Sequence, residues 1–126
     1  MKAIKYISAA FLLCCAYFAN AQKQGSVWCF GDSALVDFSD TANIITGTSK
    51  LKTRGSCASI CDTTGQFLFY AETRAGIADN TTWVFNANHV LMQGGDSIVG
   101  EGWYNELVII PYPDSDSLFY IFSIGV

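Results

Sequence analysis

Short apolar stretches separated by polar turns run along the chain from residue 26 onward. Beyond residue 22, no window of 12 or more residues shows the 3.6-residue period of an amphipathic helix. Gly, Pro, Asp, Asn, Ser and Thr punctuate the apolar stretches, as they do at turns between strands. The pattern indicates an all-β fold, with strands predicted over 26–30, 35–38, 57–61, 66–71, 81–85, 89–92, 106–110 and 117–123.

Two of these strands repeat a short motif at a spacing of 50 residues. Leu-Phe-Tyr occurs at 68–70 and again at 118–120, each time after a polar turn. The strand before each turn, 57–61 or 106–110, is spaced almost identically, so the segment 57–71 is predicted to be a β-hairpin. A repeat of roughly 40–50 residues with four short strands is typical of β-propeller blades, although two similar aromatic strands alone would produce the same echo.

A propeller blade buries its faces only against neighbouring blades. We therefore expect one to two blades of a β-propeller-like domain, forming an incomplete fragment. The expected partners are further blades or domains of the same full-length protein.

The first 21 residues have the pattern of a secretory signal peptide. The apolar run is shorter than the roughly 20 residues that a membrane-spanning helix needs. We expect cleavage, secretion to the periplasm, cell surface or exterior, and no membrane span afterwards. The domains are thus a signal peptide, 1–21, and a partial propeller-like domain, 22–126. The positive region, the apolar region and the cleavage motif are carried by Lys2 and Lys5, by residues 7–18, and by Ala19 and Ala21 ahead of Gln22.

The net charge of the chain becomes more negative once this leader is removed. The chain has 126 residues, of which 14% are charged, and its net charge is −4. The leader carries two lysines, so the remaining 105 residues have a net charge of −6. Acidic balance argues against a nucleic-acid partner, which normally requires a basic patch. The hydrophobic content of 51% also excludes a disordered chain.

Three cysteines, Cys29, Cys57 and Cys61, follow the leader. An odd number allows one disulfide plus a free thiol, or no disulfide. Cys57 and Cys61 lie on one extended segment, about 13 Å apart, which is too far for a bridge. Either could pair with Cys29, or all three could be small buried hydrophobic residues. No C-x-x-C spacing is present, and we expect no metal and no cofactor.

Residues that often carry catalysis are present without a catalytic pattern. His89 follows Asn-Ala-Asn at 86–88, a segment typical of a turn, and we assign this histidine to turn formation. The chain lacks a G-x-S-x-G motif. We assign no catalytic residue, because no spacing fixes a glycosidase-like pair among Glu72, Asp96, Glu101 and Glu106.

Aromatic residues suggest where contacts form. In a thin β architecture, Trp28 and Trp83 are expected in the core between sheets. Trp103 and Tyr104, flanked by glycines and an asparagine, form the candidate binding loop for a carbohydrate or protein ligand.

Asp-Ser or Asp-Thr followed by a small or apolar residue recurs along the chain. The pattern resembles the O-glycosylation acceptor motif of exported proteins in some Gram-negative bacteria. Turns that lead into apolar strands would produce the same pattern without any sugar. The candidate acceptors are Ser33, Thr41, Thr63, Ser97 and Ser117.

Motifs across residues 26–123 resemble, in order and spacing, the propeller-like N-terminal region of large secreted bacterial surface proteins. That family shows W-Y-F-G…A-G-L-D-F, G-C-A-S-I-S-D…G-N-L-L-F-Y and W-N-x-N-H, with Leu35 here standing in place of a usual glycine. The resemblance implies a multidomain protein, often with PKD-like modules and a C-terminal sorting domain. The matching segments are W-C-F-G and A-L-V-D-F within 28–38, G-S-C-A-S-I-C-D and G-Q-F-L-F-Y within 55–70, W-V-F-N-A-N-H-V-L-M at 83–92, and L-V-I-I-P-Y-P with L-F-Y-I-F-S within 107–123.

These observations favour an exported, non-enzymatic β-rich module for surface display, adhesion or ligand binding. The alternative is the N-terminal part of a secreted hydrolase or an envelope sensor, with its active or signalling domain beyond residue 126.

Overall fold

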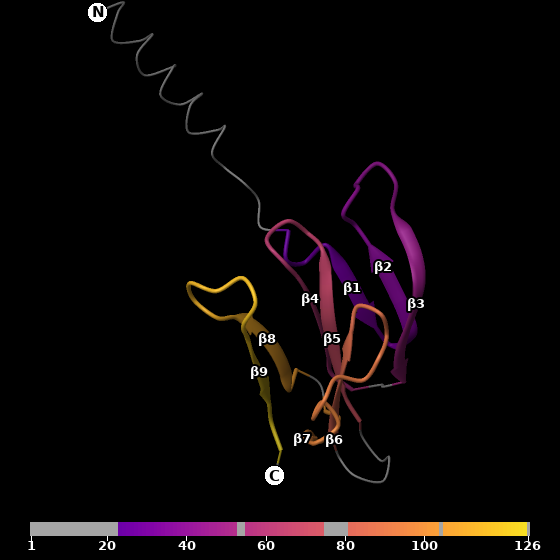
Figure 1. The fold of residues 1–126 in the computed structure, drawn as a ribbon. Coiled ribbons are helices and arrows are strands. Elements are labelled where there is room, and N and C mark those ends of the chain that lie inside the picture. The colour runs from indigo at the N-terminus through magenta and orange to yellow at the C-terminus, as the bar shows by residue number, and fades with distance from the viewer. Residues whose placement is uncertain (1–22, 53–54, 75–80, 104, 126) are drawn as a thin grey trace, which may run out of the picture.

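The computed structural model describes residues 23–52, 55–74, 81–103 and 105–125 (Figure 1). In these residues the chain forms nine strands and no helix, grouped in three antiparallel sheets, so the all-β prediction is confirmed. No helix in this part of the chain is long and apolar enough to cross a membrane. The predicted signal peptide, with Ala19, Ala21 and Gln22 at its cleavage site, lies outside the described residues, as does Tyr104.

Each sheet is a meander in which strands adjacent in sequence pair with each other. The first sheet contains β1 (Val27–Phe30), β2 (Asp32–Asp37) and β3 (Ile45–Lys52). The second contains β4 (Cys57–Cys61), β5 (Phe67–Thr73), β6 (Thr81–Asn86) and β7 (Ile98–Val99). The third is the hairpin of β8 (Leu107–Pro111) and β9 (Phe119–Ser123).

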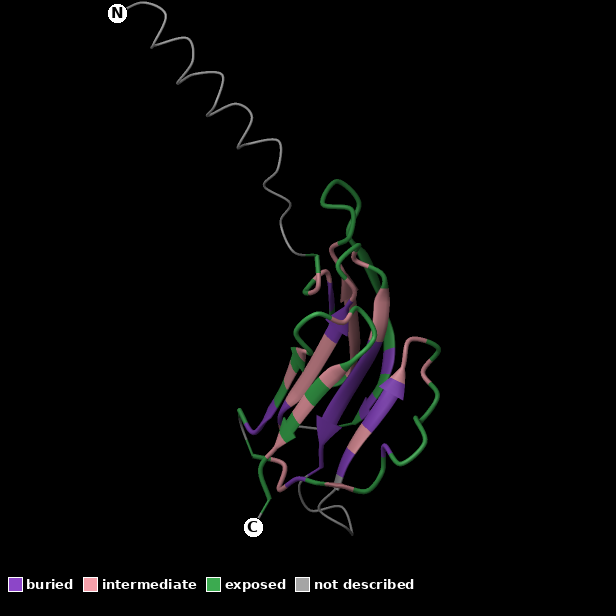
Figure 2. Cartoon of the chain, turned by 60° about the vertical axis from the view of Figure 1, so that its left-hand side comes forward, coloured by how far each residue is buried: buried purple, intermediate pink, exposed green. Residues whose placement is uncertain are grey.

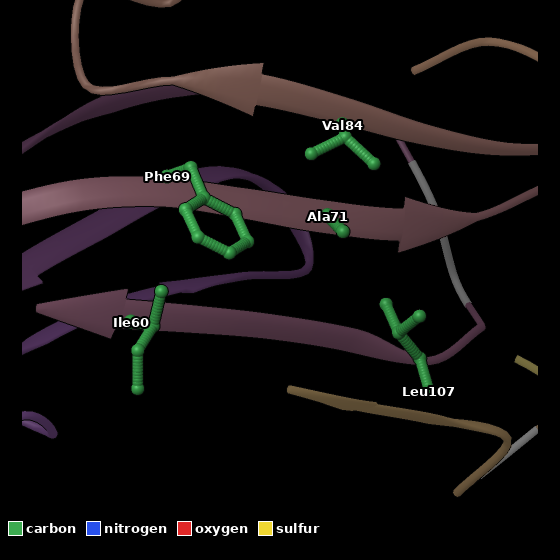
Figure 3. Close-up of a cluster of buried hydrophobic side chains, with 5 residues drawn as sticks. All are labelled: Ile60, Phe69, Ala71, Val84 and Leu107. Atoms are coloured by element: carbon green, nitrogen blue, oxygen red, sulfur yellow. The ribbon is translucent and has the colours of Figure 1, made fainter. Parts of the chain in front are cut away.

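The second sheet lies between the other two, and the buried residues concentrate in the central strands (Figures 1 and 2). Successive side chains of a strand point to opposite faces. On β5, Phe69 and Ala71 therefore face the β8–β9 hairpin, whereas Tyr70 faces the first sheet. Two clusters result: Ile60, Phe69, Ala71, Val84 and Leu107 on one side (Figure 3), and Cys29, Leu51, Tyr70 and Phe85 on the other.

The first strands of the three sheets, β1, β4 and β8, are neighbours. The Ser59 hydroxyl donates to the Val27 carbonyl at 2.7 Å and accepts from the Cys29 N–H at 3.3 Å. The Leu107 N–H on β8 donates to the hydroxyl of Ser56, the residue just before β4, at 3.2 Å. These contacts hold the first strands of the three sheets next to one another.

Each of the hairpins β4–β5 and β8–β9 begins its sheet, but the two Leu-Phe-Tyr motifs differ in orientation. Phe69 and Phe119 face each other, with ring centres 5.3 Å apart. Tyr70 faces the first sheet, whereas Tyr120 is exposed on the outer face of the hairpin.

Some strand predictions need correction. The hairpin 57–71 is confirmed by β4 pairing with β5. The predicted strand 89–92 does return beside β6, where the Asn86 N–H donates to the Val90 carbonyl and the Met92 N–H donates to the Val84 carbonyl, each at 2.9 Å. This contact amounts to a single bridge, Phe85 with Leu91, and the first two residues of β6 pair with β7 instead. Neither β3 nor β7 was predicted from the hydrophobic pattern.

The prediction that Trp28 lies in the core is wrong, because its side chain is 55% exposed. Alternation along β1 buries Val27 and Cys29 against the second sheet and turns Trp28 to the opposite face. Trp83 does pack against the cluster around Tyr70.

Candidate functional site

Trp103 lies in the loop between β7 and β8 and is 69% exposed. The buried carboxylate of Glu106 holds this loop: it accepts hydrogen bonds from the Gly102 N–H at 2.7 Å and the Trp103 N–H at 2.8 Å. A Cβ atom at Gly55 would lie only 2.5 Å from the Gly102 carbonyl oxygen, so the loop packs closely on the backbone before β4. The backbone is held while the indole faces solvent, which suits a preorganised contact residue. The binding role of Trp103 and Tyr104 stays a prediction.

Glu72, one of the four carboxylates named above, is held inside the protein by two partners. It is fully buried, and its Oε2 accepts a hydrogen bond from the Lys52 N–H at 2.7 Å. Its Oε1 lies 2.6 Å from Arg74 Nε and pairs with the same guanidinium through a second nitrogen. The guanidinium carbon stacks 3.6 Å from the centre of a Trp83 ring. This group, the Glu72 cluster, ties β3 to β5.

Sequence reasoning missed the Glu72 cluster, although one signal was present. Glu72 lies on β5 and Arg74 follows the last residue of that strand, so the two side chains, two positions apart in extended chain, emerge on the same face. Glu72 is in an ion pair and Glu106 is bonded to a loop backbone, so these two carboxylates hold the structure, whereas Asp96 is exposed. Within the described ranges, no three His, Cys, Asp or Glu side chains gather to hold a metal ion.

His89 acts as a turn residue, as predicted. Its φ is 60°, and its N–H donates to the Asn86 carbonyl at 2.9 Å. The Asn86 side chain also accepts from the backbone N–H of Val90 at 3.0 Å, which closes the turn. The His89 Nδ1 lies 2.9 Å from the Tyr70 hydroxyl, which in turn accepts from the Lys50 N–H at 3.0 Å. The buried Tyr70 thereby joins this turn to β3.

All three described cysteines are free, with Cys29 and Cys61 buried and Cys57 half-buried. Burial raises the pKa of the Cys29 thiol to about 12, with a further contribution from the other two thiols. Burial also raises the pKa values of Cys57 and Cys61. A thiol that stays protonated at neutral pH is a poor nucleophile. The prediction of small buried hydrophobic residues is confirmed for Cys29 and Cys61.

Alkaline pH is expected to destabilise the protein through Cys29. The folded state holds the neutral thiol, so the stabilising contribution is fully present below pH 9.0 and is lost as pH rises toward 12. Between these values, Cys29 alone should cost about 1.4 kcal/mol per pH unit. Urea unfolding at pH 7.5, 9.5 and 10.5 measures this loss. The Cys29→Ala variant should show a shallower loss; identical slopes in both proteins would contradict the assignment.

The candidate O-glycan acceptors differ in accessibility. Thr41, Thr63, Ser97 and Ser117 are exposed in turns or loops. Ser33 is half-buried, and its hydroxyl donates to the Leu51 carbonyl at 3.2 Å, which makes it the least suitable acceptor.

The aspartates before two of these residues form turns. Asp40 Oδ1 accepts from the Ala42 N–H at 3.0 Å, and Asp62 Oδ1 accepts from the Thr64 N–H at 2.8 Å. The Thr64 hydroxyl and the Gln66 N–H also lower the pKa of Asp62. The turn interpretation is confirmed at these two positions, and glycosylation stays a prediction.

Comparisons of the chain with protein-family models, with curated proteins and with solved structures found no match.

Proposed function

We propose that the chain is an exported, non-enzymatic β-rich module for surface display, adhesion or ligand binding. In this proposal the three sheets are consecutive parts of a propeller-like ring, with β4–β7 as one four-stranded blade. The first sheet and the β8–β9 hairpin belong to the blades on either side. The signal-peptide pattern supports export, and the held loop at Trp103 supports contact with a carbohydrate or protein ligand.

One observation carries the propeller-like part of this proposal: apolar side chains are exposed at both ends of the stack. On the hairpin, the cross-strand pairs Val108–Phe122 and Ile110–Tyr120 leave each of these four side chains at least 44% exposed. At the opposite end, Trp28 is exposed on β1, as is Phe30 at 43%. Contiguous exposed apolar residues mark interaction surfaces. A ring of stacked sheets would cover both faces, because each sheet is buried by its neighbours.

The outer face of the hairpin gives a direct test. We expect residues 22–126, expressed alone, to self-associate or to be poorly stable, because both apolar end faces stay open. The double variant Val108→Asp with Phe122→Asp should shift the chain toward the monomer in size-exclusion chromatography with light scattering.

Thr63→Asp provides the control, because Thr63 is an exposed residue in the turn between β4 and β5, outside both apolar end faces. The control should self-associate like the unmodified chain. If the unmodified chain is monomeric and melts in one sharp cooperative transition, that result would count strongly against an incomplete ring.

A further inference from the structure

An apolar groove lies between the β8–β9 hairpin and the second sheet. Its volume is about 460 Å³. Phe69 on β5 and Val84 on β6 contribute to one side. Phe119, the first residue of β9, and Leu118 just before it contribute to the other. Met92, 41% exposed, also lines it.

The groove continues an interface that is already formed. Phe69 and Val84 belong to the core cluster that holds the hairpin on the second sheet (Figure 3). At the far end of β9 the two layers meet, since the hydroxyl oxygens of Ser123 and Thr82 lie 3.0 Å apart. Nearer to Leu118, the same apolar surface is left partly open.

The second sheet indicates what would fill such a groove. There, β5 pairs with β4 on one side and with β6 on the other, and Phe85 of β6 stacks beside Tyr70 on the face toward the first sheet. The equivalent strand in the hairpin is β9, which among the described strands pairs only with β8. Its second edge offers backbone N–H and C=O groups for another strand. In the second sheet, β6 lies beside β5. The corresponding place in the hairpin is the free edge of β9, with the groove beside it.

We propose that the edge of β9 and this groove bind an extended β-strand with alternating apolar side chains. The strand adds to β9 through main-chain hydrogen bonds, and its inward side chains fill the groove, as in β-strand addition. This site deepens the proposed function, on which it rests, because it would seat a further strand of the same blade. It differs from the outer face at Val108 and Phe122, which would contact the next blade.

The experiment uses a tethered probe, because a short free peptide loses much translational and rotational entropy when it binds. The β6 sequence Thr-Thr-Trp-Val-Phe-Asn is fused after residue 126 through a flexible Gly-Ser linker. Hydrogen exchange of the β9 amides should slow by about tenfold relative to the linker alone. Exchange in β1 and β2 should not change.

Two variants separate the edge from the groove. A proline at the Val84 position of the fused peptide removes a backbone donor and should abolish the protection. Met92→Asp places a charge in the groove and should also abolish it, whereas Val108→Asp on the outer face should not. Equal protection with the proline peptide, protection at β3 instead of β9, or no protection would each overturn the proposal.

The same measurement in the Val108→Asp, Phe122→Asp double variant separates this site from the proposed function. Protection of β9 should persist there, because the outer face is not used. If that variant fails to become monomeric yet β9 is protected, the strand site stands and the stacking proposal fails. If it is monomeric and β9 is unprotected, the strand site fails and the stacking proposal stands.

Discussion

Replacing Glu72 by alanine is expected to lower the free energy of unfolding by about 3–5 kcal/mol. The change leaves the Arg74 guanidinium, whose side chain is 10% exposed, without its carboxylate partner. It also removes the acceptor of the Lys52 N–H, so two groups lose hydrogen bonds at once. Since whole domains are stable by about 5–15 kcal/mol, this variant should be partly unfolded at room temperature. Urea unfolding followed by circular dichroism measures the loss.

A matched set of variants tests whether the cause is the stranded cation. Asp96→Ala removes an exposed carboxylate and should change stability by less than about 0.5 kcal/mol. Glu72→Leu combined with Arg74→Leu removes both charges and should recover much of the loss, because an uncharged pair strands no cation. If the double variant is less stable than Glu72→Ala, the explanation through an unpaired cation is wrong.

The strands that could be predicted from sequence are those rich in aromatic and β-branched residues. β5 and β9 are examples, because both contain a run of bulky residues bounded by polar turns. β3 could not be predicted, since it is an edge strand whose only buried residues are Ser49 and Leu51. Edge strands are commonly polar, which hides them from a hydrophobic pattern. β7 has only two residues and is defined by its pairing with β6.

The candidate site, too, could be predicted from the sequence only in part. The glycines around Trp103 indicated an exposed loop, and the structure places this residue in one. The role of Glu106 could not be predicted, because its bonds to the Gly102 and Trp103 N–H groups depend on the loop turning back by three to four residues. The prediction that Trp28 lies in the core was wrong for a related reason. Alternation fixes which residues share a face, but only the packing of β1 on β4 decides which face is buried.

Phe69→Ala is expected to destabilise the protein by about 3–5 kcal/mol, and mainly on one side of the second sheet. Phe69 is 8% exposed and packs edge-to-face on Phe119, with ring centres 5.3 Å apart. This contact helps to hold β9 on the second sheet. An isolated two-stranded hairpin is at best marginally stable in water, so weakening its attachment should let β8 and β9 open locally. Hydrogen exchange measured strand by strand should show the largest loss of protection there.

The cluster around Tyr70 lies on the opposite face of β5, so β1 and β2 should keep more of their protection in the Phe69→Ala variant. Phe69→Leu keeps most of the buried volume and should lose less than about half as much stability. Leu118→Ala removes an apolar side chain that is 56% exposed and should have a much smaller effect. Equal loss of protection in all three sheets would show that the layers unfold as one unit. Such a result would contradict the separate attachment of the hairpin, because loss of the Phe69 contact would then be transmitted across β5 to the first sheet.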